Sequence, residues 1–329
     1  MSIRSSCSTG AGWPLRCTKT SGVKAIWFER LGGPEVLEVR EVPDPVPGDG
    51  EVLVDVEAVG VNFRDVYERT RENYGADPPA IIGAEAGGTS ADGERLVWNA
   101  VPYSYAERVA VPRARAVRVP DEVAVELAVA VLLQGMTAHY LAHDSYPIRA
   151  GDRVVVHAAA GGVGQLLTQL ARLRGGYVIA TASSDEKRAL ARDLGADETL
   201  SYEEFVENAK DVNAVAVYDG IGKTTFEAGF DALAPTGRMI LYGSASGRPD
   251  PVDPHTLESK GSLYLQRPTL GTYTRDPELL AARSAAVFAL VASGDLKVAI
   301  GGRYPLAEAR RAHEDLEARK TTGKLLLVP

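Results

Sequence analysis

The spacing of apolar residues divides the chain into two patterns of secondary structure. In the first pattern, short apolar runs are separated by Gly, Pro and Asp, which is typical of strands joined by turns. Strands are predicted at Val23–Phe28, Val36–Val42, Glu51–Val59, Ile81–Thr89, Arg95–Trp98, Tyr105–Val111 and Ala116–Val119. A loop over Gly60–Arg71 is expected to lead into a short helix. Strands at this close spacing predict a β-rich first domain.

In the second pattern, strands alternate with helices. Glu126–Ala142 is a predicted helix, and predicted strands follow at Arg153–His157, Tyr177–Ala182, Ala196–Ser201, Ala214–Asp219 and Gly237–Tyr242. Helices are predicted between them at Gly162–Arg174, Asp185–Leu194, Tyr202–Asn208 and Thr225–Leu233. This rhythm predicts an α/β fold with a doubly wound parallel sheet. Helices at Pro277–Ser293 and Leu306–Arg319 and a strand at Lys324–Val328 are expected to return to the first domain.

Composition narrows the classes of partner and compartment. The 329 residues are enough for two domains, and the net charge of −8 argues against a nucleic-acid or acidic-membrane partner. The longest apolar run, Leu127–Leu133, is too short to cross a membrane. The only cysteines are Cys7 and Cys17, which excludes a disulfide framework and a cysteine-based structural zinc site. This cysteine usage fits a cytoplasmic protein.

The first 22 residues differ in composition from the rest of the chain. They contain Ser, Thr, Gly, Arg and Cys, and the first acidic residue is Glu29. We expect a disordered N-terminal extension that is dispensable for folding and catalysis. An organelle transit peptide is the alternative, because such peptides are also poor in acidic residues.

The strongest local motif is a glycine-rich turn between a strand and a helix. A β-branched strand, Val154–Val156, runs into a turn of small residues that ends at Gly161, Gly162, Val163 and Gly164. Small residues let the backbone approach a pyrophosphate, and the following helix N-terminus attracts negative charge. Ala159 holds the first position of the G-x-G-x-x-G pattern, but the strand–turn–helix context supports dinucleotide binding.

The next strand indicates which dinucleotide is bound. An NAD site usually ends this strand with Asp or Glu, whereas here it ends in Thr181-Ala182-Ser183-Ser184. Lys187 follows within the first helical turn, and hydroxyls with a lysine suit a 2′-phosphate. The neighbouring Asp185 and Glu186 are interpreted as helix acids that face water. The sequence therefore favours NADPH over NADH.

A set of motifs in fixed order resembles a known family. They are Gly32–Leu37, Gly60–Asp65, Gln134–Ala138, Ala158–Gly164, Tyr218–Gly222, Lys260–Ser262 and Arg267–Leu270. Together they resemble the zinc-free NADPH:quinone oxidoreductases, the zeta-crystallin-like branch of the medium-chain dehydrogenase/reductase superfamily. The resemblance extends from about Val23 to Pro329. It implies a GroES-like domain over residues 23–135 and 272–329, and a Rossmann domain over residues 136–271.

The same resemblance implies the assembly and the site residues. A homodimer would join through the strand Ser262–Leu265. The residues that it implies for cofactor binding are Asn62, Tyr67, Thr137, Gly161, Gly162, Val163, Gly164, Ser183, Ser184, Lys187, Tyr202, Tyr242, Gly243, Ser244, Arg267 and Arg319. Asn62 and Tyr67 would also be the catalytic pair, as donors to an oxyanion that develops on the substrate. Gln134 departs from the lysine expected in this branch.

No metal is expected in the reaction. In Gly83-Ala84-Glu85, Ala84 stands where zinc-dependent relatives carry a histidine. His139 and His143 are four residues apart without a third ligand nearby, so they are interpreted as helix-surface residues. Without a metal, the substrate must be a conjugated acceptor. Reduction of a quinone is the leading hypothesis. Reduction of enoyl or alkenal double bonds and a non-catalytic NADPH-binding role are the alternatives.

Overall fold

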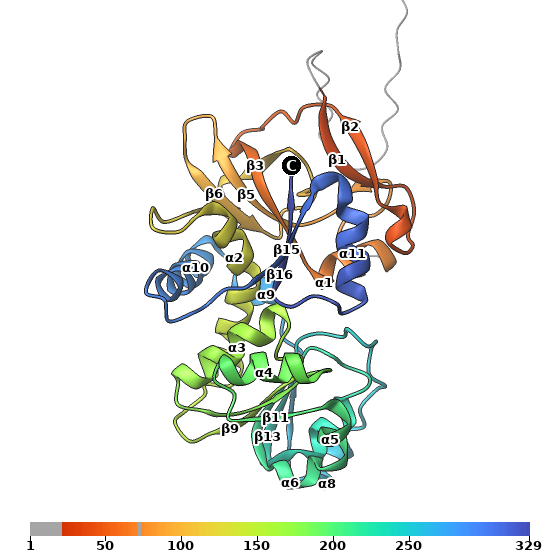
Figure 1. Ribbon diagram of the computed structural model, residues 1–329, viewed down its shortest axis with the longest axis vertical. Helices are drawn as coiled ribbons and strands as arrows, with labels where there is room; N and C mark the ends of the chain where they lie inside the picture. Colours follow the sequence, from red (N-terminus) through yellow and green to blue (C-terminus); the bar gives the residue numbers. More distant parts are fainter. Residues whose placement is uncertain (1–21, 72–73) are drawn as a thin grey trace, which may run out of the picture.

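The computed structural model describes residues 22–71 and 74–329, which form two lobes stacked along the long axis (Figure 1). The predicted disordered extension lies outside the described residues except for its last position, Gly22. One lobe is built on mainly antiparallel sheets and the other on a fully parallel sheet. The predicted α/β class, with a β-rich part beside a doubly wound parallel sheet, is confirmed.

The β-rich lobe combines strands from both ends of the chain. Its larger sheet runs in the order β15-β16-β3-β5-β6-β8, and β7 pairs with β3. The strands are β3 (Glu51–Val61), β5 (Glu85–Ser90), β6 (Arg95–Asn99), β7 (Arg108–Pro112), β8 (Val117–Arg118), β15 (Ile300–Pro305) and β16 (Lys324–Val328). Leu325 of β16 pairs with Val61 of β3, so the last strand lies beside the strand that leads into the candidate catalytic residues.

A smaller sheet of β2, β1 and β4 packs in the same lobe. Its strands are β1 (Val23–Phe28), β2 (Glu38–Val42) and β4 (Ala80–Ile81). The single strand predicted over Ile81–Thr89 was therefore wrong, because the chain is interrupted between β4 and β5. Gly83 has φ +94 there, and a Cβ at this position would lie 2.0 Å from the Tyr105 ring. Only glycine combines this positive φ with the absence of a Cβ that would clash with the ring.

The second lobe is a six-stranded parallel sheet in the order β11-β10-β9-β12-β13-β14. Its strands are β9 (Arg153–Val156), β10 (Tyr177–Thr181), β11 (Glu198–Leu200), β12 (Ala214–Asp219), β13 (Leu233–Leu241) and β14 (Tyr264–Gln266). Around it lie α3 (Gly162–Leu173), α4 (Asp185–Asp193), α5 (Tyr202–Glu207), α6 (Ala209–Val212), α7 (Phe226–Asp231) and α8 (Pro254–Ser259). The strand order reverses at β9, and ligands of such sheets bind where the order reverses.

One long helix, α2 (Val125–Tyr140), joins the lobes. It continues into a π-helical turn, Leu141–Ser145, and together these residues are long and apolar enough to cross a membrane. The apolar stretch of 18 residues within this span is 72% buried inside the protein, as expected for an apolar helix that packs in a core. The prediction that no apolar run approaches this length was wrong, because it counted only uninterrupted apolar residues.

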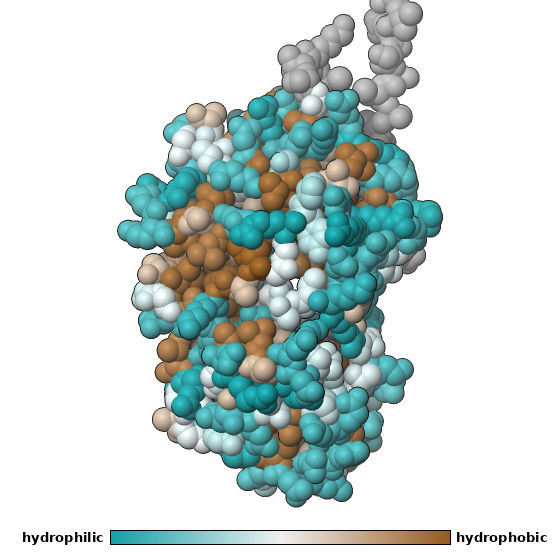
Figure 2. All heavy atoms as spheres, viewed as in Figure 1, coloured by the Kyte–Doolittle hydropathy of each residue, from teal (hydrophilic) through white to brown (hydrophobic). Residues whose placement is uncertain are grey.

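The remaining helices lie around the β-rich lobe. They are α1 (Phe63–Thr70), α9 (Leu270–Tyr273), α10 (Pro277–Ala292) and α11 (Ala309–Glu317). α10 packs on α2, and apolar surface lies over both helices in Figure 2. The sequence reading missed β15, α6, α8 and α9. All four are short, and β15 contains Gly301-Gly302, so neither a helical nor a strand period is visible there.

Candidate active site

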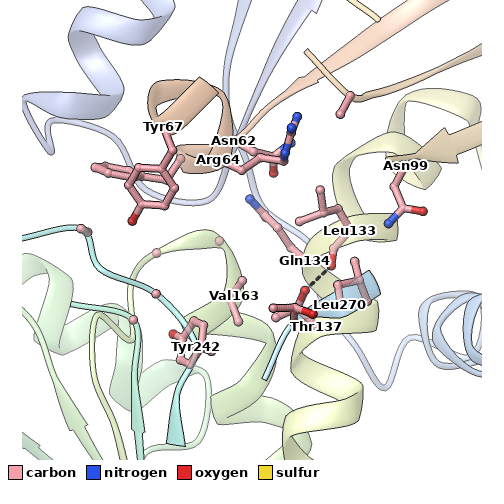
Figure 3. Close-up of a pocket in the computed structure, with 18 of the residues that line it drawn as sticks. Asn62, Arg64, Tyr67, Asn99, Leu133, Gln134, Thr137, Val163, Tyr242 and Leu270 are labelled. Atoms are coloured by element: carbon pink, nitrogen blue, oxygen red, sulfur yellow. Dashed lines mark hydrogen bonds between the residues drawn. The ribbon is translucent and has the colours of Figure 1, made fainter. Parts of the chain in front are cut away.

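A cavity of about 710 Å³ is lined by residues of both lobes (Figure 3). Most of the predicted site residues line it, namely Asn62, Tyr67, Thr137, Gly161, Gly162, Val163, Gly164, Tyr242, Gly243 and Arg267. The other predicted residues lie outside its lining: Ser183, Ser184, Lys187, Tyr202, Ser244 and Arg319. Ser244 sits directly behind the wall, since its backbone N–H donates to the Tyr67 hydroxyl at 3.1 Å.

The glycine-rich turn forms one end of the cavity. Gly161 precedes α3, and none of the described side chains caps this helix start. A Cβ on Gly162 would lie 2.2 Å from the Gln134 side chain, and one on Gly164 would lie 2.2 Å from the Ala158 carbonyl oxygen. The glycines therefore let α2 and the turn approach the helix start closely. Uncapped first-turn amides that face a cavity can bind an anion such as a pyrophosphate.

Asn62 lies at the start of α1 with its amide fully engaged. Its Nδ2 donates to the Gly60 carbonyl at 3.0 Å and to Glu85 Oε2 at 2.8 Å. Its Oδ1 accepts from Lys324 Nζ at 2.7 Å, and Lys324 also forms an ion pair with Glu85. Both amide protons are used, so this geometry argues against the predicted role of Asn62 as an oxyanion donor. The residue instead ties α1 to β5 and β16.

Tyr67 keeps a hydroxyl proton that it can donate. The backbone N–H of Ser244 donates to the hydroxyl oxygen, so this contact does not use the hydroxyl proton. The ring packs edge-on against Phe63 and Tyr74, with centroids 5.4 and 5.5 Å away. Figure 3 shows Tyr67 opposite Gln134 and Thr137 across the cavity. Of the predicted catalytic pair, Tyr67 is the residue with a donor to offer.

Thr137 differs from Tyr67 in what its hydroxyl can do. It donates its proton to the Leu133 carbonyl oxygen at 2.7 Å, which is the dashed line in Figure 3. Its oxygen can therefore only accept a further hydrogen bond. The Tyr67 hydroxyl can therefore donate to a ligand in the cavity, whereas the Thr137 hydroxyl can only accept.

Comparison with known proteins assigns the chain to a family. Residues 48–101 match the alcohol dehydrogenase GroES-like domain, and residues 162–282 match the zinc-binding dehydrogenase family. The chain is 40% identical to a quinone oxidoreductase of Pseudomonas aeruginosa, across 93% of this chain and 99% of that protein. The chain belongs to the quinone oxidoreductases of the medium-chain dehydrogenase/reductase superfamily.

Two further relatives show the cofactor and the acceptors that members of this family are named for. A mycobacterial protein solved in complex with NADPH is 44% identical, has a TM-score of 0.89, and matches 93% of this chain and all of that one. A 2-haloacrylate reductase of Burkholderia is 34% identical across 93% of this chain and 99% of its own length. A quinone oxidoreductase fold is thus shared by proteins named for different acceptors.

In this quinone oxidoreductase, the predicted 2′-phosphate residues gather beyond the tip of β10. Lys187 Nζ donates to the Arg319 carbonyl oxygen at 2.6 Å, and Ser184 caps α4 by accepting the Lys187 N–H at 3.3 Å. Burial and the nearby Arg319 charge both lower the pKa of Lys187. Two cations close together are stabilised by an anion between them. Asp185 does not fill that role, because its exposed carboxylate pairs with Arg188.

Tyr202 belongs to the same group. The hydroxyl is engaged by Thr181 and by the Ala158 backbone, while burial raises the pKa of Tyr202 and the Arg319 charge opposes that rise. The backbone N–H of Gly323, in the segment that follows Arg319, donates to the Ala160 carbonyl at 3.4 Å. The C-terminal segment therefore packs against the glycine-rich turn and carries Arg319 to Lys187, a contact across 132 residues.

Two acidic residues of α1 lie beside the cavity on either side of Arg64. Arg64 Nη1 lies 2.9 Å from Asp65 Oδ1 and 3.1 Å from Glu68 Oε2. Burial raises the pKa of Asp65. Burial also raises the pKa of Glu68 to about 7, although the Arg64 charge opposes the rise. Glu68, which lines the cavity, is thus half-protonated near neutral pH.

This shift predicts a pH-dependent stability. An acid whose folded pKa of about 7 exceeds its unfolded value of 4.5 binds a proton on folding, so stability falls as pH rises across that window. Glu68→Gln removes the titration. Between pH 5 and pH 7 we expect the variant to gain about 2 kcal/mol of unfolding free energy relative to the parent. Urea unfolding at several pH values measures this.

The control for this experiment is Glu203→Gln, because Glu203 is an exposed acid of α5. Its stability should follow that of the parent at every pH. Parallel pH profiles for the parent and Glu68→Gln would mean that Glu68 keeps an ordinary pKa in the folded state.

The histidines contribute no metal site in the described part of the chain. Across residues 22–71 and 74–329 there is no group of three or more His, Cys, Asp or Glu that could hold a metal ion. His139 and His143 stack with ring centroids 4.0 Å apart, and Arg283 of α10 lies 2.8 Å from His139 Nδ1. Burial lowers the pKa of His139 to about 4. Both rings are half-buried, so the two histidines lie at the edge of the helix, where Arg283 partly covers His139.

Several residues in or beside the cavity were not identified from the sequence. Lys324 had been assigned only to a strand, although a lone lysine among Leu325, Leu326 and Leu327 marks a buried charge that needs a partner. Asn99, Arg64 and Tyr74 line the cavity. Arg64 lies within the Gly60–Asp65 motif without having been assigned a role, and no local motif marks Asn99 or Tyr74, which only the tertiary fold brings to the cavity.

Proposed function

We propose that this chain is an NADPH-dependent, zinc-independent reductase of quinones. The observation that carries the proposal is a single cavity that has the glycine-rich turn at one end and the Tyr67 hydroxyl in its wall. A cofactor at the turn and an acceptor beside Tyr67 would then share one cavity. Membership of the quinone oxidoreductases and similarity to an NADPH-bound mycobacterial protein support the same activity.

The residues fit NADPH along its length. The amides of Gly161–Gly164 would hold the pyrophosphate. Thr137, Tyr242, Gly243 and Ser244 would surround the nicotinamide and its ribose. Ser183, Ser184, Lys187, Tyr202 and Arg319 would surround the 2′-phosphate, and Arg267 would close over the cofactor. The neighbouring positive charges of Lys187 and Arg319 are the feature that would select the phosphate.

For this reaction the protein needs to position the cofactor and the acceptor and to offer one hydrogen-bond donor. NADPH supplies a hydride, and a quinone or conjugated carbonyl accepts it without a metal. Negative charge then develops on the acceptor oxygen, and Tyr67 donates a hydrogen bond to that oxygen. Asn62 acts by fixing the start of α1, on which Tyr67 is carried.

The second candidate is reduction of an activated carbon–carbon double bond. It is favoured by the 34% identity to a 2-haloacrylate reductase. A non-catalytic NADPH-binding role is the third candidate. Oxidation of NADPH by the purified chain, measured side by side with 1,4-naphthoquinone and cyclohex-2-enone, separates them. Faster turnover of the quinone is expected. Preference for the enone would support the second candidate, and NADPH binding without turnover of either would support the third.

Cofactor selection gives a quantitative test. Lys187→Ala is expected to weaken NADPH binding about tenfold, or about 1.4 kcal/mol, because it removes a partly solvated charge-assisted contact. Binding of NADH, which lacks the 2′-phosphate, should change by less than about twofold. Fluorescence titration with each cofactor measures both constants. Lys210→Ala, an exposed lysine of α6, is the control. Equal weakening of NADPH binding and NADH binding would mean that Lys187 does not contact the 2′-phosphate.

We also propose a cytoplasmic homodimer that joins through β14. This strand is the edge of the parallel sheet, and its side chains Tyr264 and Leu265 are 57% and 39% exposed. An exposed apolar edge strand is suited to pairing with a second copy. The domain limits at residues 23–135 with 272–329, and at 136–271, remain a proposal; α2 crosses the limit between 135 and 136.

A further inference from the structure

A buried histidine of α11, His313, connects two residues of α1 that lie one helical turn apart. The residue is 0% exposed, and its Nδ1 accepts a hydrogen bond from Arg69 Nε at 3.2 Å. Its Nε2 lies 3.2 Å from the Tyr105 hydroxyl oxygen, and that hydroxyl donates to Asp65 Oδ2 at 3.0 Å. Asp65 and Arg69 both belong to α1, so one imidazole ring holds this helix at two points.

The donors in this series of hydrogen bonds all point toward Asp65. A guanidinium has no acceptor atom, so His313 Nδ1 must accept from Arg69, and in a neutral ring Nε2 then carries the proton. Nε2 therefore donates to the Tyr105 oxygen, which leaves the Tyr105 proton for Asp65. Burial, together with the Arg69 charge, lowers the pKa of His313 to about 3, so the ring stays neutral near pH 7.

The ends of this network are fixed to the backbone and to α11. Asp65 Oδ2 also accepts the Asn62 N–H at 2.8 Å, at the residue that begins α1. Arg69 Nη2 forms an ion pair with Glu317 at the end of α11. Asp65 and Arg69 are each 0% exposed, so a hydrogen bond lost here leaves a buried polar group unpaired. The network therefore fixes where α1 begins and how it is rotated about its axis.

The face of α1 opposite this network carries Tyr67. At 3.6 residues per turn, Asp65 and Arg69 share one face of the helix, and Tyr67 lies roughly 160° away from each of them. The Tyr67 side chain lines the cavity (Figure 3), and its hydroxyl accepts the Ser244 N–H at 3.1 Å. A rotation of α1 that His313 prevents on one face would therefore displace the hydroxyl on the other.

We propose that His313 is a positioning residue for Tyr67 and acts through its contacts with Arg69 and with the Tyr105–Asp65 pair. The inference rests on the proposed reductase function and on Tyr67 as the donor to the developing oxyanion. Among the described residues, His313 is not part of the cavity lining, so it touches neither the acceptor nor the cofactor. A displacement of about 1 Å at a reacting group can cost about 10²-fold in rate. His313 therefore affects turnover more than NADPH binding.

The first test compares three changes in the network. Turnover is measured with 1,4-naphthoquinone and cyclohex-2-enone, and the acceptor that Tyr67→Phe affects more is used. His313→Leu is expected to lower kcat roughly tenfold while NADPH affinity changes by less than about twofold. His313→Gln carries an acceptor oxygen and a donor nitrogen, so it should restore most of the turnover. Tyr105→Phe breaks only the link to Asp65 and should show the loss even if His313→Leu does not fold.

The control for these changes is His255→Leu, because His255 is an exposed histidine of α8. It should have the kcat and the NADPH affinity of the parent. A loss of turnover in this variant equal to that in His313→Leu would overturn the inference, because the effect would then not depend on the buried network.

A double-mutant cycle separates positioning from a general loss of structure. In a Tyr67→Phe background, Tyr105→Phe and His313→Leu should each lower kcat by less than about twofold, because a hydroxyl that is absent cannot be positioned. The same tenfold loss in that background would overturn the inference and leave the reductase function standing. Parent-like turnover in Tyr105→Phe, or in Tyr67→Phe with both acceptors, would also overturn it. Failure of the parent to reduce either acceptor would remove the proposed function and the inference together.

Discussion

Lys324→Met is expected to lower the free energy of unfolding by about 3–5 kcal/mol. Lys324 and Glu85 are 1% and 0% exposed, and they form an ion pair that is shared with Asn62. Among the residues that the structure describes, removing the ammonium leaves the buried carboxylate with only the Asn62 amide and the Leu133 N–H as donors. Two hydrogen bonds do not compensate a desolvated charge. Chemical denaturation of the parent and the variant measures the loss.

A double-mutant cycle separates the charge from the loss of packing. Glu85→Gln combined with Lys324→Met removes both charges, so it should recover part of the stability that the single change loses. Lys24→Met, at an exposed strand position, is the matched control and should change stability by less than about 0.5 kcal/mol. A loss below about 1 kcal/mol in Lys324→Met would contradict the account of the pair as a buried charge network.

Tyr67→Phe is expected to lower kcat and kcat/KM together, by roughly 10²-fold for an enone. Loss of one donor to a developing oxyanion typically costs on the order of 3 kcal/mol. An interaction made mainly in the transition state reduces both parameters and leaves NADPH binding nearly unchanged. The effect should be smaller for quinones, which are more easily reduced. Steady-state kinetics with both acceptors and a separate NADPH titration measure these quantities.

Two further variants complete this experiment. Tyr177→Phe removes a hydroxyl at the start of β10, outside the cavity lining, and should behave as the parent enzyme. Asn62→Ala should reduce stability as well as turnover, because the Asn62 amide is a partner of Lys324 and Glu85. Parent-like turnover in Tyr67→Phe would mean that hydride transfer relies on the position of the cofactor alone.

The glycine-rich turn and the parallel sheet were predictable because their signals are local. Val154–Val156 and Gly161–Gly164 are adjacent in the sequence and are adjacent in the structure. A buried β-branched strand, small turn residues and an amphipathic helix each leave a pattern within about ten residues. The same locality explains why the absence of a carboxylate at the end of β10 could be interpreted from the sequence.

The network around Asn62 was not predictable in the same way. Its contacts with Glu85 and Lys324 span 23 and 262 residues, and they depend on the register between β16 and β3. A residue type shows which hydrogen bonds a side chain can make, but not which of them the fold has already used. Asn62 was therefore interpreted as a donor to substrate.

We propose above all that the chain reduces a quinone with NADPH and without a metal. The most direct test is a single turnover under anaerobic conditions, with exhaustively chelated protein that has been premixed with NADPH. On mixing with 1,4-naphthoquinone, NADPH absorbance should disappear in step with the quinone and in equal amount. The same result is expected without prior chelation. Bound NADPH that stays reduced in the presence of the quinone, or turnover that returns only when zinc is added, would contradict the account.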